Sequence, residues 1–195
     1  MNFSEAIKHS NTDEWFTPKE VVEAIVPYLE RAGIKHVLCP FDAEDSEFVK
    51  VLGEHGFDVA YSHIATGGDF FEIEDLDDYD AVVSNPPFSK RQAVLEKLFE
   101  SNTSFAMILN FNGLFDSKKR WELFRENDFE LLIPKGRMCF KNGEGMANSP
   151  NFQSIWVCRG IGKKQIEFMD APCSKSVGGT TDSRMTGQGV AEKGE

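Results

Sequence analysis

Two consecutive prolines, Pro86 and Pro87, constrain the fold more than any other feature of the sequence. A proline has no backbone N–H to donate to a sheet or a helix, and Pro86 keeps Asn85 extended because its ring would clash with a helical residue before it. Residues 81–83 (Ala-Val-Val) predict a short buried strand. The chain therefore leaves a buried strand through a rigid, extended loop. Ligands of open α/β sheets bind at the carboxyl ends of the strands, so we expect a binding site at this loop.

Strand-like and helix-like segments alternate along the chain, which predicts an α/β fold with a mostly parallel central sheet. The last strands follow one another without helices, so we expect an antiparallel hairpin at the edge of this sheet. Thr17 is the expected N-cap of the first helix, with Pro18 at its first position, and Pro27 should distort or shorten that helix. Helices are predicted at residues 18–31, 47–54, 89–99 and 118–126, and strands at residues 36–40, 57–64, 81–83, 105–109, 130–134, 138–140 and 152–158.

Length and composition predict one folded domain with loosely held ends. The chain has 195 residues, of which 41% are hydrophobic and 17 are Phe, which is enough for a substantial core. We expect a polar N-terminal arm over residues 1–14 and a folded domain over residues 15–170. The tail over residues 171–195 is rich in Gly, Ser and Thr with almost no large apolar side chain, so we expect it to be disordered.

The net charge of −11 is unevenly distributed along the chain. Residues 1–80 contain 19 acidic and 5 basic side chains, whereas residues 81–195 contain 13 acidic and 16 basic ones. A nucleic acid would therefore approach the second half, because binding of a polyanion depends on basic side chains. The acidic half fits either a solvated face or a contact surface for a protein partner.

Several classes of protein do not fit the sequence. No stretch approaches the ~18 consecutive apolar residues that a membrane span requires, and the first residues contain no apolar core of a secretory signal. The four cysteines form no paired CxxC spacing and the four histidines no HExxH motif. We therefore expect a cytoplasmic protein that contacts no membrane, with reduced thiols and no metal site.

The loop after residues 81–83 has a chemical logic for an amino group. The Pro86 carbonyl oxygen and the side-chain oxygen of Asn85 can converge on an exocyclic NH₂ as two acceptors. They would hold the group and stabilise the positive charge that develops on its nitrogen during attack on a methyl donor. Phe88 offers a ring on which a planar base can stack. An ordinary strand-to-helix loop, stiffened by prolines, explains the same residues equally well.

The motif Asn85-Pro86-Pro87-Phe88 resembles the catalytic motif of S-adenosylmethionine-dependent amino-methyltransferases. That family acts mainly on adenine N6 in DNA, and also on some protein glutamines and RNA bases. Residues 15–18 (Trp-Phe-Thr-Pro) resemble a segment that precedes the first strand in many adenine-specific members. Residues 137–140 and 152–158 resemble the late strands of small phage-borne adenine methyltransferases. The resemblance covers about residues 13–160 and implies a Rossmann-like methyltransferase fold in a bacterial or phage-infected cell.

The resemblance also implies roles for individual residues. Asn85, Pro86 and Phe88 would be catalytic, S-adenosylmethionine would be the cofactor, and DNA would be the substrate. The residues implied to bind the cofactor are Phe16, Thr17, Pro40, Asp42, Asp69 and Phe70. No separate target-recognition domain is left over, so the candidates for contacting the substrate are Lys118, Arg120, Arg137 and Phe140. The basic residues among them are otherwise explained as a solvated helix start and scattered surface charge.

Two segments depart from the family pattern. The family's first strand ends in a glycine-rich loop, whereas residues 39–46 contain no glycine. The carboxylates of Asp42, Glu44 and Asp45 can meet the amino group of the cofactor instead; otherwise the loop has lost cofactor binding. The second strand of the family ends in an acidic residue that holds the ribose, where this chain has Ser62 and His63.

The sequence thus predicts methyl transfer from S-adenosylmethionine to an exocyclic amino group, foremost adenine N6 in DNA. Two alternatives stay open. One is a catalytically inactive binding or decoy module, which the glycine-free loop and the negative charge favour. The other keeps the chemistry but uses a protein glutamine or an RNA base as acceptor. The sequence indicates neither a target site nor an oligomeric state.

Overall fold

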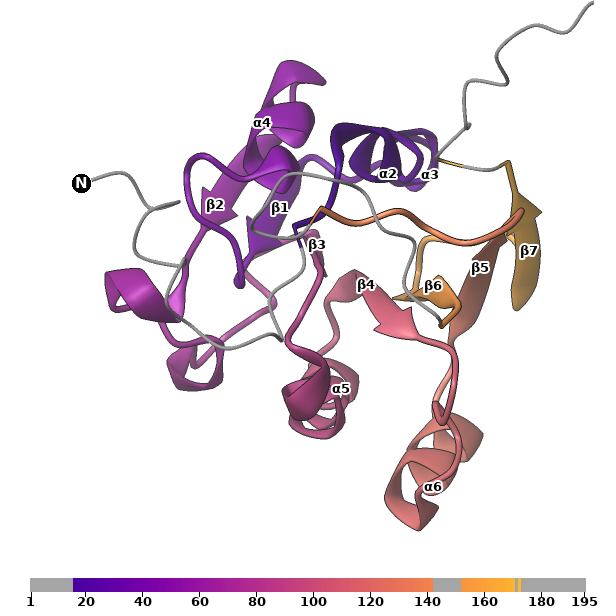
Figure 1. The fold of residues 1–195 in the computed structure, drawn as a ribbon. Helices are drawn as coiled ribbons and strands as arrows, with labels where there is room; N and C mark the ends of the chain where they lie inside the picture. Colours follow the sequence, from indigo (N-terminus) through magenta and orange to yellow (C-terminus); the bar gives the residue numbers. More distant parts are fainter. Residues whose placement is uncertain (1–15, 142–151, 171, 173–195) are drawn as a thin grey trace, which may run out of the picture.

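A computed structural model describes residues 16–141, 152–170 and 172 of the chain. It contains a seven-stranded sheet in the order β2-β1-β3-β4-β6-β5-β7 (Figure 1). The strands are β1 (His36–Cys39), β2 (Asp58–Tyr61), β3 (Ala81–Ser84), β4 (Ser104–Asn110), β5 (Glu130–Pro134), β6 (Ser154–Arg159) and β7 (Ile166–Met169). The helices are α2 (Lys19–Glu23), α3 (Val26–Arg31), α4 (Glu47–Glu54), α5 (Arg91–Glu100) and α6 (Lys118–Glu126), with short 3₁₀ turns η2 (Ile64–Thr66), η3 (Phe70–Glu72) and η4 (Phe88–Lys90).

The predicted α/β fold with a mostly parallel sheet is confirmed. β1 pairs in parallel with both β2 and β3, and β3 pairs in parallel with β4. β6 runs antiparallel to both of its neighbours, β4 and β5, and β7 lies parallel to β5 at the edge. The antiparallel strand therefore lies inside the sheet rather than in a hairpin at its edge.

Helices cover both faces of the sheet, as Figure 1 shows, so the molecule has three layers. On one face, α2, α3 and α4 bury side chains such as Val22, Leu52 and Phe48 against Trp156 of β6. On the other, α5 and α6 bury Leu95, Leu98 and Phe124 against β3, β4 and β6. Apart from polar residues at their ends, β3 and β4 are apolar because both of their faces are covered.

The first helical region is broken as the proline predicts. α2 ends at Glu23, and α3 restarts at Val26 with Pro27 in its first turn. Pro27 has no N–H to bond back to the preceding turn, so the helix cannot continue through it. The expected N-cap is wrong: Pro18 occupies that position without a side-chain hydrogen bond, and Thr17 is used elsewhere.

Two other predictions differ from the structure near the end of the chain. Residues 138–140 form no strand; Met138 and Phe140 are apolar because they are fully buried in the core. β7 was not expected, because Ile166 and Phe168 point to solvent and the strand lacks a buried apolar face. The expected arm over residues 1–14, and the tail over residues 171–195 apart from residue 172, lie outside the described residues.

Trp156 of the inserted strand β6 is the largest fully buried side chain of the core, and its substitution tests this assignment. Trp156 is fully buried and meets the Phe48 ring edge-on at a centroid distance of 6.2 Å. We expect Trp156→Ala to lower the free energy of unfolding by about 3–5 kcal/mol. Trp121→Ala, at a half-exposed position on α6, should cost less than about 1 kcal/mol. Urea denaturation followed by circular dichroism measures both; equal losses would contradict this assignment of the core.

Candidate active site

The strand order fixes where a site can form. From β1 the chain moves to one side of the sheet to form β2, and β3 then pairs with the opposite side of β1. The loops after β1 and β3 therefore diverge at their carboxyl ends, and this is the position at which open α/β sheets bind ligands in a crevice. The residues at these ends are 40–46 and 85–90, which include the three predicted catalytic residues together with Pro40 and Asp42.

Asp42 is the buried centre of this region. Its side chain is 8% exposed, and its Oδ2 accepts a hydrogen bond of 2.5 Å from the hydroxyl of Ser84, the last residue of β3. Its backbone N–H donates to the carbonyl of Ser62, after β2, at 3.1 Å. Ser46 adds a second hydroxyl bond to the carboxylate and also caps α4 by accepting from the Val49 N–H. Through its carboxylate and its backbone, Asp42 thus joins the loop after β1 to the carboxyl ends of β2 and β3.

Burial raises the pKa of Asp42 from 3.8 to about 6, while the hydrogen bonds from Ser84 and Ser46 act in the opposite direction. No basic side chain among the described residues forms an ion pair with it. A buried carboxylate is costly unless it is paired or hydrogen-bonded. Asp42 is therefore a negative centre with two neutral partners and no protein cation, which suits a ligand that carries a positive group.

Asn85 follows directly after Ser84 and is held by the segment before α2. Its Nδ2 donates to the hydroxyl of Thr17 at 3.2 Å, and Thr17 itself is 8% exposed. Phe16 and Lys141 exchange two backbone hydrogen bonds, of 3.0 and 2.9 Å, which anchor this segment to the chain after Phe140. The structure thus brings together Thr17, Asp42 and Asn85, which lie far apart in the sequence.

Pro86 and Phe88 complete the loop. Pro86 is buried, and its carbonyl oxygen accepts no hydrogen bond from any residue in the described part of the chain. Phe88 is half-buried and meets the ring of Phe152 edge-on, with centroids 5.5 Å apart. The loop therefore presents a fixed carbonyl acceptor beside an aromatic ring, as its sequence predicts.

The turn after β2 approaches the loops from the other side. Gly67 has φ of +90°, which favours glycine, and Gly68 lies so close to β2 that a Cβ there would be 2.7 Å from the Cβ of Ser62. Asp69 follows, partly exposed, with Oδ1 accepting from the Phe71 N–H at 2.9 Å. The glycines that the first loop lacks thus occur one strand later, where Gly68 packs closely against Ser62.

Two of the residues expected to bind ligands lie in the core instead. Phe70 is 2% exposed, and its ring packs against the ring of Phe41 in the loop after β1, with centroids 5.1 Å apart. It therefore supports that loop from the core. Phe140 is fully buried and cannot stack on a base. Pro40 is buried at the end of β1, where its carbonyl accepts a 3.5 Å hydrogen bond from the Ser62 hydroxyl.

The basic residues expected to contact a substrate divide into two groups. Arg120 is 9% exposed and donates to the carbonyls of Leu114 and Gly113, both at 2.9 Å, so it holds the loop before α6 rather than reading a substrate. Lys118 is exposed at the start of α6, 3.8 Å from Glu122, and Arg137 is exposed after β5. Of the four predicted substrate contacts, Lys118 and Arg137 are the two that are accessible.

Three residues of the site were not predicted as such. Ser84 is a polar side chain at the end of an otherwise apolar strand, which is the signal that could have identified it. Ser46 directly precedes a predicted helix, the usual position of a capping serine, and Gly68 stands out by its Gly-Gly dipeptide. Each of these residues positions another segment of the site, and such a role leaves no recognisable sequence motif.

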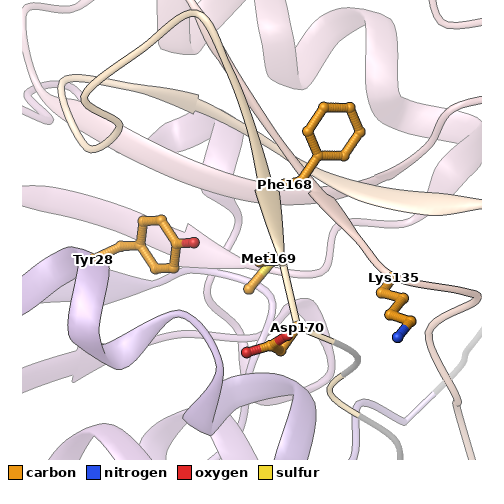
Figure 2. A pocket seen from close by; sticks show the side chains of 5 residues that line it. All are labelled: Tyr28, Lys135, Phe168, Met169 and Asp170. Atoms are coloured by element: carbon orange, nitrogen blue, oxygen red, sulfur yellow. The ribbon is translucent and has the colours of Figure 1, made fainter.

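A shallow pocket of about 470 Å³ lies elsewhere, between α3 and the ends of β5 and β7. It is lined by Tyr28, Lys135, Phe168, Met169 and Asp170, of which Phe168 points away from the others (Figure 2). β4 and β6 separate it from β3, a distance of roughly 15 Å at the usual strand spacing. It contains none of the predicted site residues, and we do not assign it a role.

Metal clusters, membrane spans and cysteine pairing bear on the remaining predictions. Within the described ranges, no three His, Cys, Asp or Glu side chains are grouped so that they could hold a metal ion. None of the helices that the structure describes is long and apolar enough to cross a membrane. Cys39 and Cys158 are free, buried thiols, but the expectation of reduced thiols is wrong for Cys139, which is disulfide-bonded.

Comparisons with known proteins bear on this site. No protein-family profile matches the chain. Over 83 residues the chain is 34% identical to the type II methyltransferase M.EcoRI of Escherichia coli, a match that covers 41% of this chain and 25% of M.EcoRI. The chain thus spans about a quarter of the length of that relative. The methyltransferase resemblance seen in the sequence is confirmed over this segment.

Two solved structures match the chain at low identity. The M protein of the type I restriction enzyme EcoKI has a TM-score of 0.49 and 13% identity, covering 83% of this chain and 49% of that one. A precorrin-6y C5,15-methyltransferase from Geobacter metallireducens has a TM-score of 0.41 and 14% identity, covering 75% of this chain and 93% of that one. At such values neither likeness bears on function.

The raised pKa of Asp42 predicts a pH dependence of stability. Between about pH 4 and pH 6 the folded state keeps a proton that the unfolded state releases, so the free energy of unfolding should fall as the pH rises through this range and level off above about pH 7. Asp42→Asn should remove this dependence and stabilise the protein at pH 8 by about 2 kcal/mol. Asp45→Asn, at an exposed position of the same loop, is the control and should leave the dependence intact. A flat profile in the wild type would refute the assignment.

The close approach at Gly68 predicts a second stability effect. Gly68→Ala places a Cβ 2.7 Å from that of Ser62, so the turn or β2 must shift, at a cost of about 1–3 kcal/mol. Gly53→Ala is the matched control: it lies in α4 with open space around the new Cβ and should be neutral or stabilise by up to about 1 kcal/mol. Thermal denaturation measures both, and a neutral Gly68→Ala would show that the approach is not required.

Proposed function

We propose that the chain binds S-adenosylmethionine between the carboxyl ends of β1 and β3 and transfers its methyl group to an exocyclic amino nitrogen. The observation that carries this proposal is the pair of unlike centres in one crevice. Asp42 is a buried carboxylate without a basic partner among the described residues. Asn85 and Pro86, at the end of the adjacent strand, offer neutral acceptor oxygens. The first centre suits a cation, and the second suits an amino group.

Two carboxylates would hold the cofactor: Asp42 in the loop after β1 and the partly exposed Asp69 in the turn after β2. The amino and sulfonium groups of S-adenosylmethionine are both positive, which matches the unpaired charge of Asp42. When bound, the cofactor supplies an electrophilic methyl group: its C–S bond breaks as the N–C bond forms, and the electron pair stays on sulfur.

The loop 85–88 would act on the acceptor. The oxygen of the Asn85 side chain and the carbonyl of Pro86 accept the two N–H groups of the amine, which directs the nitrogen lone pair away from them. Positive charge grows on this nitrogen during transfer, and the two fixed oxygens stabilise it without having to reorient. The nitrogen then loses one proton to solvent. Phe88 stacks on the planar ring that carries the amine.

We propose adenine N6 in DNA as the acceptor. The support is the Asn-Pro-Pro-Phe motif, together with the similarity of 83 residues to a type II methyltransferase. A base must leave the duplex to reach the loop, and stacking on Phe88 would offset part of the energy of unstacking. Lys118 and Arg137 are accessible cations in the half of the chain that carries net positive charge, and would contact phosphates.

Transfer of a tritiated methyl group from S-adenosylmethionine to unmethylated DNA tests this function directly. We expect wild-type protein to label DNA, and nuclease digestion to release N6-methyladenine. Asn85→Ala should lower the rate by about 10²–10³-fold, because one fixed acceptor is lost at the reacting nitrogen. Asn102→Ala, at an exposed asparagine that bonds only to Asp77 in the described structure, is the control and should retain activity.

The outcomes separate the alternatives. Label in protein or RNA but not in DNA would keep the chemistry and change the acceptor. Binding of S-adenosylmethionine without transfer of its methyl group to DNA, RNA or protein would refute the proposed methyl acceptors. Absence of both binding and transfer would favour the inactive binding module, for which the net charge of −11 is the supporting observation.

A further inference from the structure

We infer that Thr17 is a positioning residue for the catalytic amide: its hydroxyl holds the Nδ2 of Asn85 and thereby aims the Asn85 oxygen at the amino group of the acceptor. This inference rests on the proposed function and deepens it. It assigns to Thr17 a role distinct from the helix N-cap and the cofactor contact that the sequence predicts.

Thr17 does not cap the helix that follows it. A threonine before a helix ordinarily accepts from backbone N–H groups of the first turn. Here Pro18 occupies the cap position without a side-chain bond, and the Thr17 hydroxyl is turned toward β3 instead. A polar side chain that is only 8% exposed needs a partner, and the described partner is the Asn85 amide at 3.2 Å.

An asparagine amide is directional but nearly symmetric in shape. It presents an acceptor oxygen on one side and an NH₂ donor on the other, and rotation by 180° exchanges the two. An amino-group acceptor site works only with the oxygen facing the substrate, because the flipped amide would direct N–H against N–H. In the structure the Thr17 hydroxyl accepts from Nδ2, and in this orientation the amide oxygen, which leaves the same carbon in another direction, faces away from Thr17.

The segment that carries Thr17 is itself fixed. Phe16, the preceding residue, exchanges two backbone hydrogen bonds with Lys141, and the following helix α2 buries Val21 and Val22 in the core. The backbone of Thr17 is therefore fixed on both sides, so its hydroxyl can restrain the Asn85 amide before a substrate arrives. Such preorganisation avoids reorganisation during the reaction.

Two substitutions separate the hydroxyl from the shape of the side chain. Thr17→Val keeps the volume and removes the hydroxyl, whereas Thr17→Ser keeps the hydroxyl and removes a methyl group. We expect Thr17→Val to lower kcat by about 10²-fold, the size of effect that misplacement of a reacting group causes. KM for DNA and the affinity for S-adenosylmethionine should change less than about threefold. Thr17→Ser should retain kcat within about threefold.

Thr103→Val is the matched control. Thr103 is 4% exposed, and its hydroxyl donates to Asp77 at 3.0 Å, but it lies at the amino end of β4, whereas the site lies at the carboxyl ends of β1 and β3. It undergoes the same change of chemistry at a similar burial. We expect it to lower stability without changing kcat, so an effect of Thr17→Val through stability alone would appear in both variants.

A readout without catalysis distinguishes this inference from the proposed function. The side-chain NH₂ protons of Asn85 are observable by NMR, and their exchange with solvent should be slow in the wild type, faster in Thr17→Val and slow again in Thr17→Ser. Unchanged exchange in Thr17→Val would overturn the inference whether or not the protein is an enzyme. If the wild type transfers methyl groups, kcat unchanged in Thr17→Val, or equal losses in Thr17→Val and Thr17→Ser, would also overturn it. If the wild type transfers none, the proposed function fails and the exchange rates alone decide whether Thr17 orients the amide.

Discussion

The hydrogen bond between Ser84 and Asp42 is the contact on which the site depends. It joins the last residue of β3 to the loop after β1, at the point where the strand order diverges and a crevice must open. The same carboxylate is bonded by Ser46 at the start of α4, and its backbone by Ser62 after β2. A buried carboxylate lowers the stability of the fold at neutral pH. A positively charged ligand bound beside Asp42 would offset this cost.

Much of the architecture could be predicted from local pattern. α4, α6 and β5 begin and end at the predicted residues, because serines cap both helices and apolar runs define the strand. β7 could not be predicted, because the side chains of Ile166 and Phe168 face solvent and no burial pattern marks the strand. The insertion of β6 between β4 and β5 depends on long-range pairing, which no local sequence encodes.

The candidate site was predictable where chemistry follows a motif and not where it follows packing. Asn85 and Pro86 lie at the end of a buried strand as expected, because prolines dictate the loop. Arg120 and Phe140 have the residue types of accessible contacts, yet one holds a loop and the other fills the core. The absence of glycine from the first loop suggested a lost site, whereas Gly67 and Gly68 allow the close approach one strand later. Burial and proximity, which tertiary structure alone supplies, decide each of these cases.

The central claim is that the carboxyl ends of β1 and β3 form a site for a positively charged cofactor. Calorimetric titration of S-adenosylmethionine into the purified chain measures it most directly. The account predicts binding of one molecule per chain with micromolar affinity at pH 8, where Asp42 is ionised, and a weaker affinity at pH 5, where it is protonated. Absence of binding at pH 8, or an affinity that does not change between the two pH values, would contradict it.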